Sequence, residues 1–172
     1  RDDANSQTYR QKLLENFNQS GLENALKWPP WAGDWGDAFS QADALAASNW
    51  LKDKGFYTRG HVMVWPSKRN MPEFVQQYMP AEQPQNADDA VLDAVNAHIT
   101  DLSTQTQGLV DEWDVLNEPF DNHYLMDAFG DDKMVDWFTL AKELNPNALM
   151  YINDYSIVSG GGANVAHQDH YF

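Results

Sequence analysis

The feature that most constrains the fold of this chain is the alternation of short strand-like segments with amphipathic helical segments. Four strand-like segments are present, at about residues 17–22, 56–65, 112–117 and 148–153. Helical spacing of apolar residues follows each of them, at intervals of roughly thirty to fifty residues. This order is typical of βαβ units around a parallel sheet. We therefore predict a single α/β domain, without an internal repeat or an interdomain linker.

Helices are predicted where apolar residues recur every three or four positions. A first helix over residues 6–16, with Ser6 as a candidate cap, precedes the first strand. The later helices are expected at Phe39–Trp50 before Gly55, from Asp88-Asp89 through Leu102 to Gly108, at Met134–Leu144 before Pro146, and from near Ala163, with a single turn at Glu73–Gln77. The segment 28–37 is rich in Trp and Pro, and we expect a loop there.

Composition narrows the classes of partner. The chain of 172 residues carries 26 acidic and 11 basic side chains, a formal net charge of −15, which disfavours nucleic acid and anionic membranes as partners. A neutral sugar polymer is not repelled. The absence of cysteine excludes disulfide bonds, thiolate zinc sites and thiol nucleophiles. Aromatic residues make up 13% of the chain, enough for a large core or for a surface that stacks on flat ligands.

Polar and aromatic side chains gather where each predicted strand ends. In parallel α/β proteins the carboxyl ends of the strands share one face, and active sites are built there. We therefore expect one pocket formed by four segments of the chain. Its candidate residues are Glu23, Asn24, Lys27 and Trp28 after the first strand, His61 and Trp65 in the second, Asn117 and Glu118 in the third, and Asn153, Asp154 and Tyr155 in the fourth.

Glu118 has the properties expected of an acid in glycoside cleavage. This reaction needs a protonated carboxyl group for the leaving oxygen and a second carboxylate near the anomeric carbon. Glu118 follows the apolar-flanked segment 113–116, where partial burial would raise its pKa. Asn117 is able to hydrogen-bond a sugar hydroxyl. Flat faces for sugar rings are offered by Trp28, Trp31, Trp35 and Trp65, of which we expect Trp28 to support the loop.

Four motifs resemble the successive signatures of glycoside hydrolase family 10, the (β/α)₈-barrel endo-xylanases. They are Leu22-Glu23-Asn24-Ala25-Leu26-Lys27-Trp28, Arg59-Gly60-His61-Val62-Met63-Val64-Trp65, Trp113-Asp114-Val115-Leu116-Asn117-Glu118 and Ile152-Asn153-Asp154-Tyr155. They occur in the family's order and span nearly the whole chain. The resemblance implies a retaining, endo-acting enzyme that cleaves internal β-1,4 linkages of xylan, without a metal or another cofactor, in an extracellular or periplasmic location.

The same resemblance implies a role for each site residue. Glu118 is the acid/base and Asn117 contacts the 2-hydroxyl at the cleavage point. The glycone subsites are lined by Glu23, Asn24, Lys27, His61 and Trp65, whereas Asn153 and Tyr155 border the far side of the cleft. The family's nucleophilic Glu lies on a later strand, roughly a hundred residues past the acid/base, and so outside this chain. Residues 1–172 are thus expected to be about half a barrel. The first strand and the last three would come from the same longer polypeptide.

Several alternatives remain open from the sequence. Pro66, Ser67 and Lys68 follow Trp65 where the family usually has a His and, shortly beyond, a Gln, so a related β-glycanase with another polysaccharide substrate is possible. A non-catalytic carbohydrate-binding half-barrel, or a half-barrel that pairs with another chain, are the rivals from other classes. We expect no metal at the acidic cluster 111–118 or at His167 and His170, and no phosphate loop at 160–162.

Overall fold

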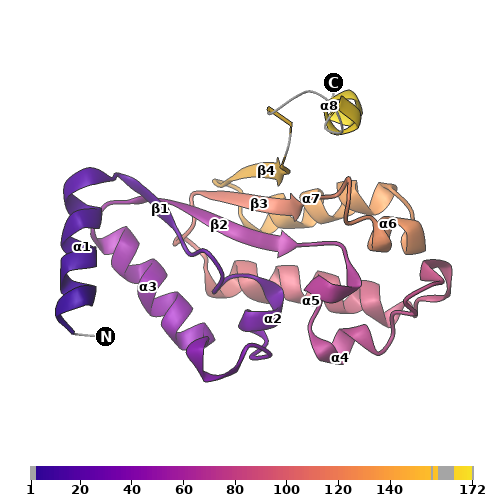
Figure 1. Ribbon diagram of the computed structural model, residues 1–172, viewed down its shortest axis with the longest axis horizontal. Helices are drawn as coiled ribbons and strands as arrows, with labels where there is room; N and C mark the ends of the chain where they lie inside the picture. Colours follow the sequence, from indigo (N-terminus) through magenta and orange to yellow (C-terminus); the bar gives the residue numbers. More distant parts are fainter. Residues whose placement is uncertain (1–2, 156, 159–164, 172) are drawn as a thin grey trace.

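The computed structural model describes residues 3–155, 157–158 and 165–171 (Figure 1). Its centre is a four-stranded parallel sheet with the strand order β1-β2-β3-β4, so each strand pairs with the next one in the chain. The strands are β1 Gln19–Gly21, β2 Tyr57–Val64, β3 Glu112–Asn117 and β4 Leu149–Asn153. Consecutive parallel neighbours joined by helical connections form the predicted βαβ arrangement.

Eight α-helices connect or flank the described strands, and α3, α5 and α7 pack directly on the sheet. Their bounds are α1 Ala4–Asn16, α2 Trp28–Trp31, α3 Gln41–Asp53, α4 Glu73–Gln76, α5 Ala90–Gln105, α6 Tyr124–Phe129, α7 Asp132–Leu144 and α8 Val165–Tyr171, with short 3₁₀ turns η1 Gly36–Ala38, η2 Lys68–Asn70 and η3 Pro84–Asn86. No helix within the described ranges combines the length and the apolar composition of a membrane span.

Most predicted elements are confirmed, two predictions are corrected, and one helix was not predicted. The first helix begins at Ala4, and its cap is Asp3, whose side chain accepts a hydrogen bond from the Ser6 backbone amide at 2.9 Å. Ser6 was therefore the wrong cap, because it lies within the first turn. The segment 28–37 is not wholly a loop, since α2 begins at Trp28 and places Pro29 in its first turn, where a missing N–H costs nothing. Helix α6 was not predicted at all. Ala163 and residues 160–162 lie outside the described residues.

The two faces of the sheet differ in character. The register pairs Arg59 with Glu112 and His61 with Asp114, so these side chains share one face, whereas Gly60 and Trp113 point to the other. Trp113 is fully buried in the core beneath the helices. A Cβ atom on Gly60 would lie 2.4 Å from the Trp113 ring, so only glycine allows this close packing. One face is thus an apolar core and the other carries charge.

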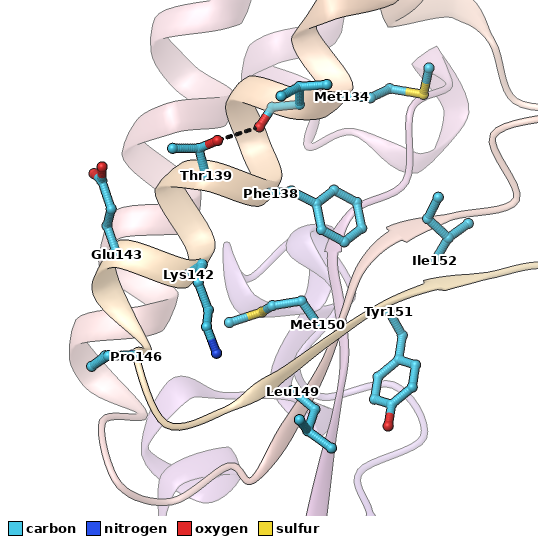
Figure 2. Close-up of a pocket in the computed structure, with 11 residues that line it drawn as sticks. Met134, Phe138, Thr139, Lys142, Glu143, Pro146, Leu149, Met150, Tyr151 and Ile152 are labelled. Carbon is cyan, nitrogen blue, oxygen red and sulfur yellow. Dashed lines mark hydrogen bonds between the residues drawn. The ribbon is translucent and has the colours of Figure 1, made fainter.

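An apolar groove runs along the β4 edge of the sheet, between β4 and α7 (Figure 2). Its volume is about 1170 Å³, and its floor and walls include Phe138 and Met150. The exposed fraction is 50% for Leu149 and 47% for Ile152, which are high values for large apolar residues in a strand. Contiguous exposed apolar surface of this kind is typical of an interaction site or a binding groove. Among the described residues, β4 pairs only with β3.

A stacked pair of rings fixes the loop after β1 to helix α5. Trp28 lies parallel to His98, with ring centroids 4.5 Å apart and an interplanar angle of 6°. Trp28 is buried, which confirms that it supports the loop. His98 is also buried, and its Nε2 atom has no hydrogen-bond partner among the described residues. Burial lowers the pKa of His98 to about 3, because the charged imidazolium would lose its hydration.

This buried imidazole predicts a pH dependence of stability. In the unfolded chain a histidine binds a proton below about pH 6.5, whereas folded His98 stays neutral down to about pH 3. The unfolded state therefore binds more protons in this window, and the free energy of unfolding falls as the pH is lowered, by at most about 1.4 kcal/mol per pH unit.

His98→Phe should flatten the dependence between pH 6.5 and 4 while keeping a ring against Trp28. Denaturant unfolding at several pH values measures the slope for both proteins. A His98 imidazole whose NMR signals titrate near pH 6.5 in the folded protein would contradict this account.

Candidate active site

Glu118 follows directly after β3 in an unusual backbone conformation. Its φ is +50°, the only positive φ of a described residue other than glycine. The left-handed conformation costs a non-glycine residue about 1–3 kcal/mol. Two backbone hydrogen bonds hold it: the Glu118 amide donates to the Asn153 carbonyl at 2.7 Å, and the Asn122 amide donates to the Glu118 carbonyl at 2.9 Å. Backbone strain of this kind clusters at functional sites, so Glu118 is a candidate for a functional position.

Two donors hold the Glu118 carboxylate, and both bind the same oxygen. The Trp65 indole Nε1 donates to Glu118 Oε2 at 3.0 Å, and the Asn122 amide Nδ2 donates to the same atom at 3.2 Å. Asn122 is itself buried. Among the described residues, none hydrogen-bonds Glu118 Oε1. One carboxylate oxygen is therefore anchored, and the other is available to give or take a proton.

Lys27 and Asn24 join Trp65 from the end of β1. The Lys27 ammonium donates to Asn24 Oδ1 at 2.8 Å and lies 5.2 Å from the centroid of the Trp65 ring. This is the geometry of a cation–π contact. The ring of His61 meets Trp65 edge to face, with centroids 6.3 Å apart. Thus side chains predicted from two strand ends lie beside the carboxylate that follows a third.

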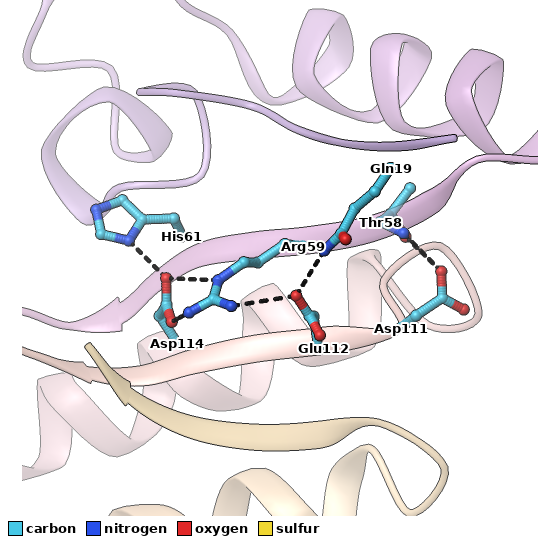
Figure 3. A network of polar contacts seen from close by, with 7 residues as sticks. All are labelled: Gln19, Thr58, Arg59, His61, Asp111, Glu112 and Asp114. Carbon is cyan, nitrogen blue, oxygen red and sulfur yellow. Dashed lines mark hydrogen bonds and ion pairs between the residues drawn. The ribbon is translucent and has the colours of Figure 1, made fainter. Parts of the chain in front are cut away.

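His61 is oriented by a buried carboxylate (Figure 3). Its Nδ1 atom lies 2.9 Å from Asp114 Oδ2, and the Arg59 guanidinium donates to both oxygens of Asp114, at 2.5 and 3.3 Å. Because an ionised carboxylate only accepts hydrogen bonds, the Nδ1 atom of His61 carries the proton. The opposite nitrogen, Nε2, is then an acceptor when the ring is neutral.

The Arg59 guanidinium lies between two carboxylates in this network, those of Asp114 and Glu112. Burial alone would raise the pKa of Asp114, but hydrogen bonds from His61 and Arg59 and their charges outweigh it, so the pKa lies below its usual value. Arg59 also bridges to Glu112 Oε1 at 3.2 Å, which in turn accepts from Gln19 Nε2 at 2.8 Å (Figure 3). Three adjacent strands are thereby joined on the charged face.

On the other side of Glu118, Asn153 donates through Nδ2 to Asn117 Oδ1 at 2.7 Å. The Asn117 amide nitrogen is consequently turned away from Asn153 and offers its protons elsewhere. Tyr155 is exposed, and its hydroxyl donates a hydrogen bond to the Asp121 carboxylate in the segment after Glu118. Glu23 is also exposed and makes no hydrogen bond or ion pair with the residues that the structure describes. Contacts therefore link Asn24, Lys27, His61 and Trp65 to Glu118, and the Glu118 backbone to Asn153, which binds Asn117. Trp28 stacks on His98 instead, and Asp154 accepts hydrogen bonds from the Tyr155 amide and the Tyr171 hydroxyl.

Two residues of the site escaped the sequence analysis. Asn122 carried no signal beyond its position four residues after Glu118. The sequence did contain a signal for Asp114, because a charged residue within an apolar strand needs a partner of opposite charge or a hydrogen-bond donor. Conversely, Trp31 is not a sugar-stacking face, since it is buried and donates through Nε1 to Asp101 at 2.8 Å. Trp35 remains exposed.

The acidic residues in and beside β3 pair with basic side chains of the chain itself. Asp111 binds Lys52 at 2.7 Å, whereas Glu112 and Asp114 bind Arg59. Within the part of the chain that the structure describes, no group of three His, Asp or Glu side chains has the arrangement of a metal site. The side chains of His167 and His170 lie outside the described set.

A four-stranded parallel sheet flanked by helices, with Glu118 directly after β3, has the architecture of about half of a (β/α)₈ barrel. The chain belongs to glycosyl hydrolase family 10, whose sequence model matches residues 1–167. The resemblance inferred from the four motifs is thus confirmed.

Several known proteins resemble this chain. It is 30% identical over 154 residues to an endo-1,4-beta-xylanase of Agaricus bisporus, and 28% identical over 148 residues to endo-1,4-beta-xylanase 1 of Arabidopsis thaliana. Among solved structures, native xylanase 10B of Thermotoga maritima superposes with a TM-score of 0.76 at 21% identity over 99% of this chain. An endoxylanase from a sugarcane soil metagenome superposes with a TM-score of 0.73 at 22% identity over 91% of this chain.

The chain spans only part of these proteins. It covers 43% of the Agaricus protein and 15% of the Arabidopsis protein, although 85% and 86% of this chain are matched. In the two structures the matched part is 51% and 46% of the solved chain. The four strands therefore correspond to about half of a (β/α)₈ barrel, as the sequence predicted.

Asn122 should be needed for turnover although it has no predicted contact with a substrate. In the full-length protein, Asn122→Ala removes one of two donors that hold Glu118 Oε2, and we expect kcat to fall about tenfold, equivalent to ~1.4 kcal/mol, with little change in KM. Steady-state glycosidase kinetics measure both constants. The control is Asn49→Ala, the same substitution at an exposed site on α3. A loss confined to KM would mean that Asn122 contributes to binding.

Proposed function

We propose that this chain is part of a retaining, endo-acting glycoside hydrolase that cleaves internal β-1,4 linkages of xylan, with Glu118 as the acid/base. The single observation that carries the proposal is the Glu118 carboxylate, anchored through Oε2 by Trp65 and Asn122 with Oε1 left open, in a member of this family. The xylanases of Agaricus and Arabidopsis to which the chain is similar support the choice of substrate.

In this mechanism Glu118 Oε1 first donates its proton to the oxygen of the leaving sugar. The partner carboxylate, which we assign to sequence outside these residues, attacks the anomeric carbon and forms a glycosyl-enzyme. Water then attacks the anomeric carbon and loses a proton to the same oxygen of Glu118, while the bond to the partner carboxylate breaks and the sugar is released. Retention of configuration requires the two carboxylates to be about 5–5.5 Å apart.

The surrounding side chains support a sugar-binding cleft. We assign Glu23, Asn24, Lys27, His61 and Trp65 to the glycone subsites, and Asn153 and Tyr155 to the far side. Asn117 would meet the 2-hydroxyl through its amide nitrogen, since its oxygen is occupied by Asn153. His61 would accept a hydroxyl proton at Nε2, because Asp114 holds the proton on Nδ1.

We propose that the remainder of the barrel, including its first strand and its last three, comes from the same longer polypeptide. The apolar groove along β4 supports this assignment, since a following strand and helix would cover Leu149, Ile152 and Val135, all of which are exposed. Residues 1–172 would then be one incomplete domain. An extracellular or periplasmic location fits a polymeric substrate that is too large to enter a cell.

Removal of the acid should depend on the leaving group. In the full-length protein, Glu118→Ala should lower kcat on xylan by about 10²–10⁴-fold, whereas substrates with good leaving groups should lose much less in the glycosylation step. Kinetics with aryl xylobiosides whose phenols differ in pKa measure this difference. Glu118→Gln is the shape-matched control and should behave alike. Equal losses on all leaving groups would exclude Glu118 as the acid.

The substrate is tested by comparing polysaccharides. We expect the full-length protein to release reducing ends from xylan at least tenfold faster than from mixed-linkage glucan or carboxymethyl cellulose. Pro66 and Lys68, which depart from the family's usual residues, make another β-glycan the second candidate. Lys68 binds the Met79 carbonyl and so is tied to the chain's own backbone. Faster release from a glucan would favour the second candidate, and affinity without any release would identify a binding module.

A further inference from the structure

A small cationic pocket adjoins the site, between the loop after β1 and the segment after β2. Its volume is about 30 Å³, and Lys27, Arg69 and the rings of Trp35 and Trp65 are among its walls. One water needs about 10–15 Å³, and pockets that hold whole ligands measure several hundred Å³. The pocket therefore suits a group of a few atoms and is too small for a complete sugar ring. It lies next to the reacting centre, because Trp65 also binds Glu118.

Several basic side chains of this acidic chain pair with carboxylates, but within the described part of the chain the two cations of this pocket do not; Lys68 and Lys142 bind backbone carbonyls instead. The formal net charge is −15, and Lys12, Lys52, Arg59 and Lys133 all pair with carboxylates. Among the described residues, no carboxylate pairs with Lys27 or Arg69. Lys27 donates to the neutral Asn24 side chain, and Arg69 is exposed. Two positive side chains thus face one small space without a negative partner from the chain.

We propose that Arg69, together with Lys27, binds the carboxylate of a uronic acid carried by the substrate. The proposal rests on the glycanase function assigned above and adds a preference for acidic substrates. The planar guanidinium matches a carboxylate through two parallel N–H···O hydrogen bonds, and the ammonium adds a second charge. Trp35 and Trp65 line the same pocket.

The overall negative charge does not prevent this binding. Charges farther than about 8–10 Å are screened at physiological ionic strength, whereas contacts within the pocket are screened much less. Repulsion by distant carboxylates would slow the approach of an acidic glycan, and the local pair would hold it once bound. Without such a pair an acidic substrate would have no favourable contact at this end of the site.

The test uses the full-length protein and three matched xylo-oligosaccharides: one unbranched, one with a glucuronate branch, and the same branched compound with its carboxyl group reduced to an alcohol. The last two differ only in charge. We expect the wild type to have a kcat/KM about tenfold higher on the acidic compound than on its reduced form. Arg69→Gln should bring this ratio close to one. Lys54→Gln, which removes one positive charge at an exposed residue after α3, is the control and should keep the ratio.

A fourth compound, a linear oligosaccharide with the uronate in its main chain, distinguishes the source of the carboxylate. A charge preference seen only with this compound assigns the pocket to a backbone unit, and one seen only with the branched compound assigns it to a side group. A ratio of one in the wild type for both acidic compounds, or an unchanged ratio in Arg69→Gln, would overturn the proposal.

The two proposals fail in different ways. If the unbranched compound is hydrolysed but the charge has no effect on kcat/KM, the glycanase function is supported and the uronate site is excluded. If no compound is hydrolysed, the glycanase function falls. Calorimetric binding of the acidic compound and its reduced form to Glu118→Gln then decides the pocket: tighter binding of the acidic form supports it, and equal affinity overturns it.

Discussion

The contact on which the charged face depends is the one between Arg59 and the buried carboxylate of Asp114. A charge out of water is stable only when it is paired and fully hydrogen-bonded. Asp114 meets this condition by accepting from both Arg59 and His61. The same contacts join β2 to β3 and hold one proton on Nδ1 of His61. One ion pair thus couples the stability of the sheet to the orientation of a side chain in the cleft.

The site itself combines strain with support from both sides. Glu118 holds a left-handed backbone conformation because β4 accepts its amide proton and Asn122 donates to its carbonyl. The side chain is then anchored by one oxygen, through Trp65 from the end of β2 and Asn122 from the following loop. A carboxyl group held this way keeps its second oxygen in one place, which general acid catalysis requires.

The apolar groove and the cationic pocket point to two kinds of missing partner. Along β4, large apolar side chains are exposed, and we propose that the remainder of the barrel covers them. Lys27 and Arg69 line a small pocket, and we propose that an anionic group of a few atoms binds between them. The first feature supports our proposal for how the fold is completed, and the second supports our proposal for an acidic group on the substrate.

The amino-acid sequence by itself determined most of the elements and placed the candidate polar residues at the strand ends. Strand Glu112–Asn117 was predicted with its observed bounds, because an apolar run between turn signals depends on local patterning. Helix α6 was missed, since six residues carry too little periodicity. Only the tertiary structure decided which side chains meet: Gly60 beneath Trp113, Asn122 against Glu118, Trp31 turned into the core. These contacts depend on strand register and on loop geometry, which arise when distant segments pack and which no local pattern contains.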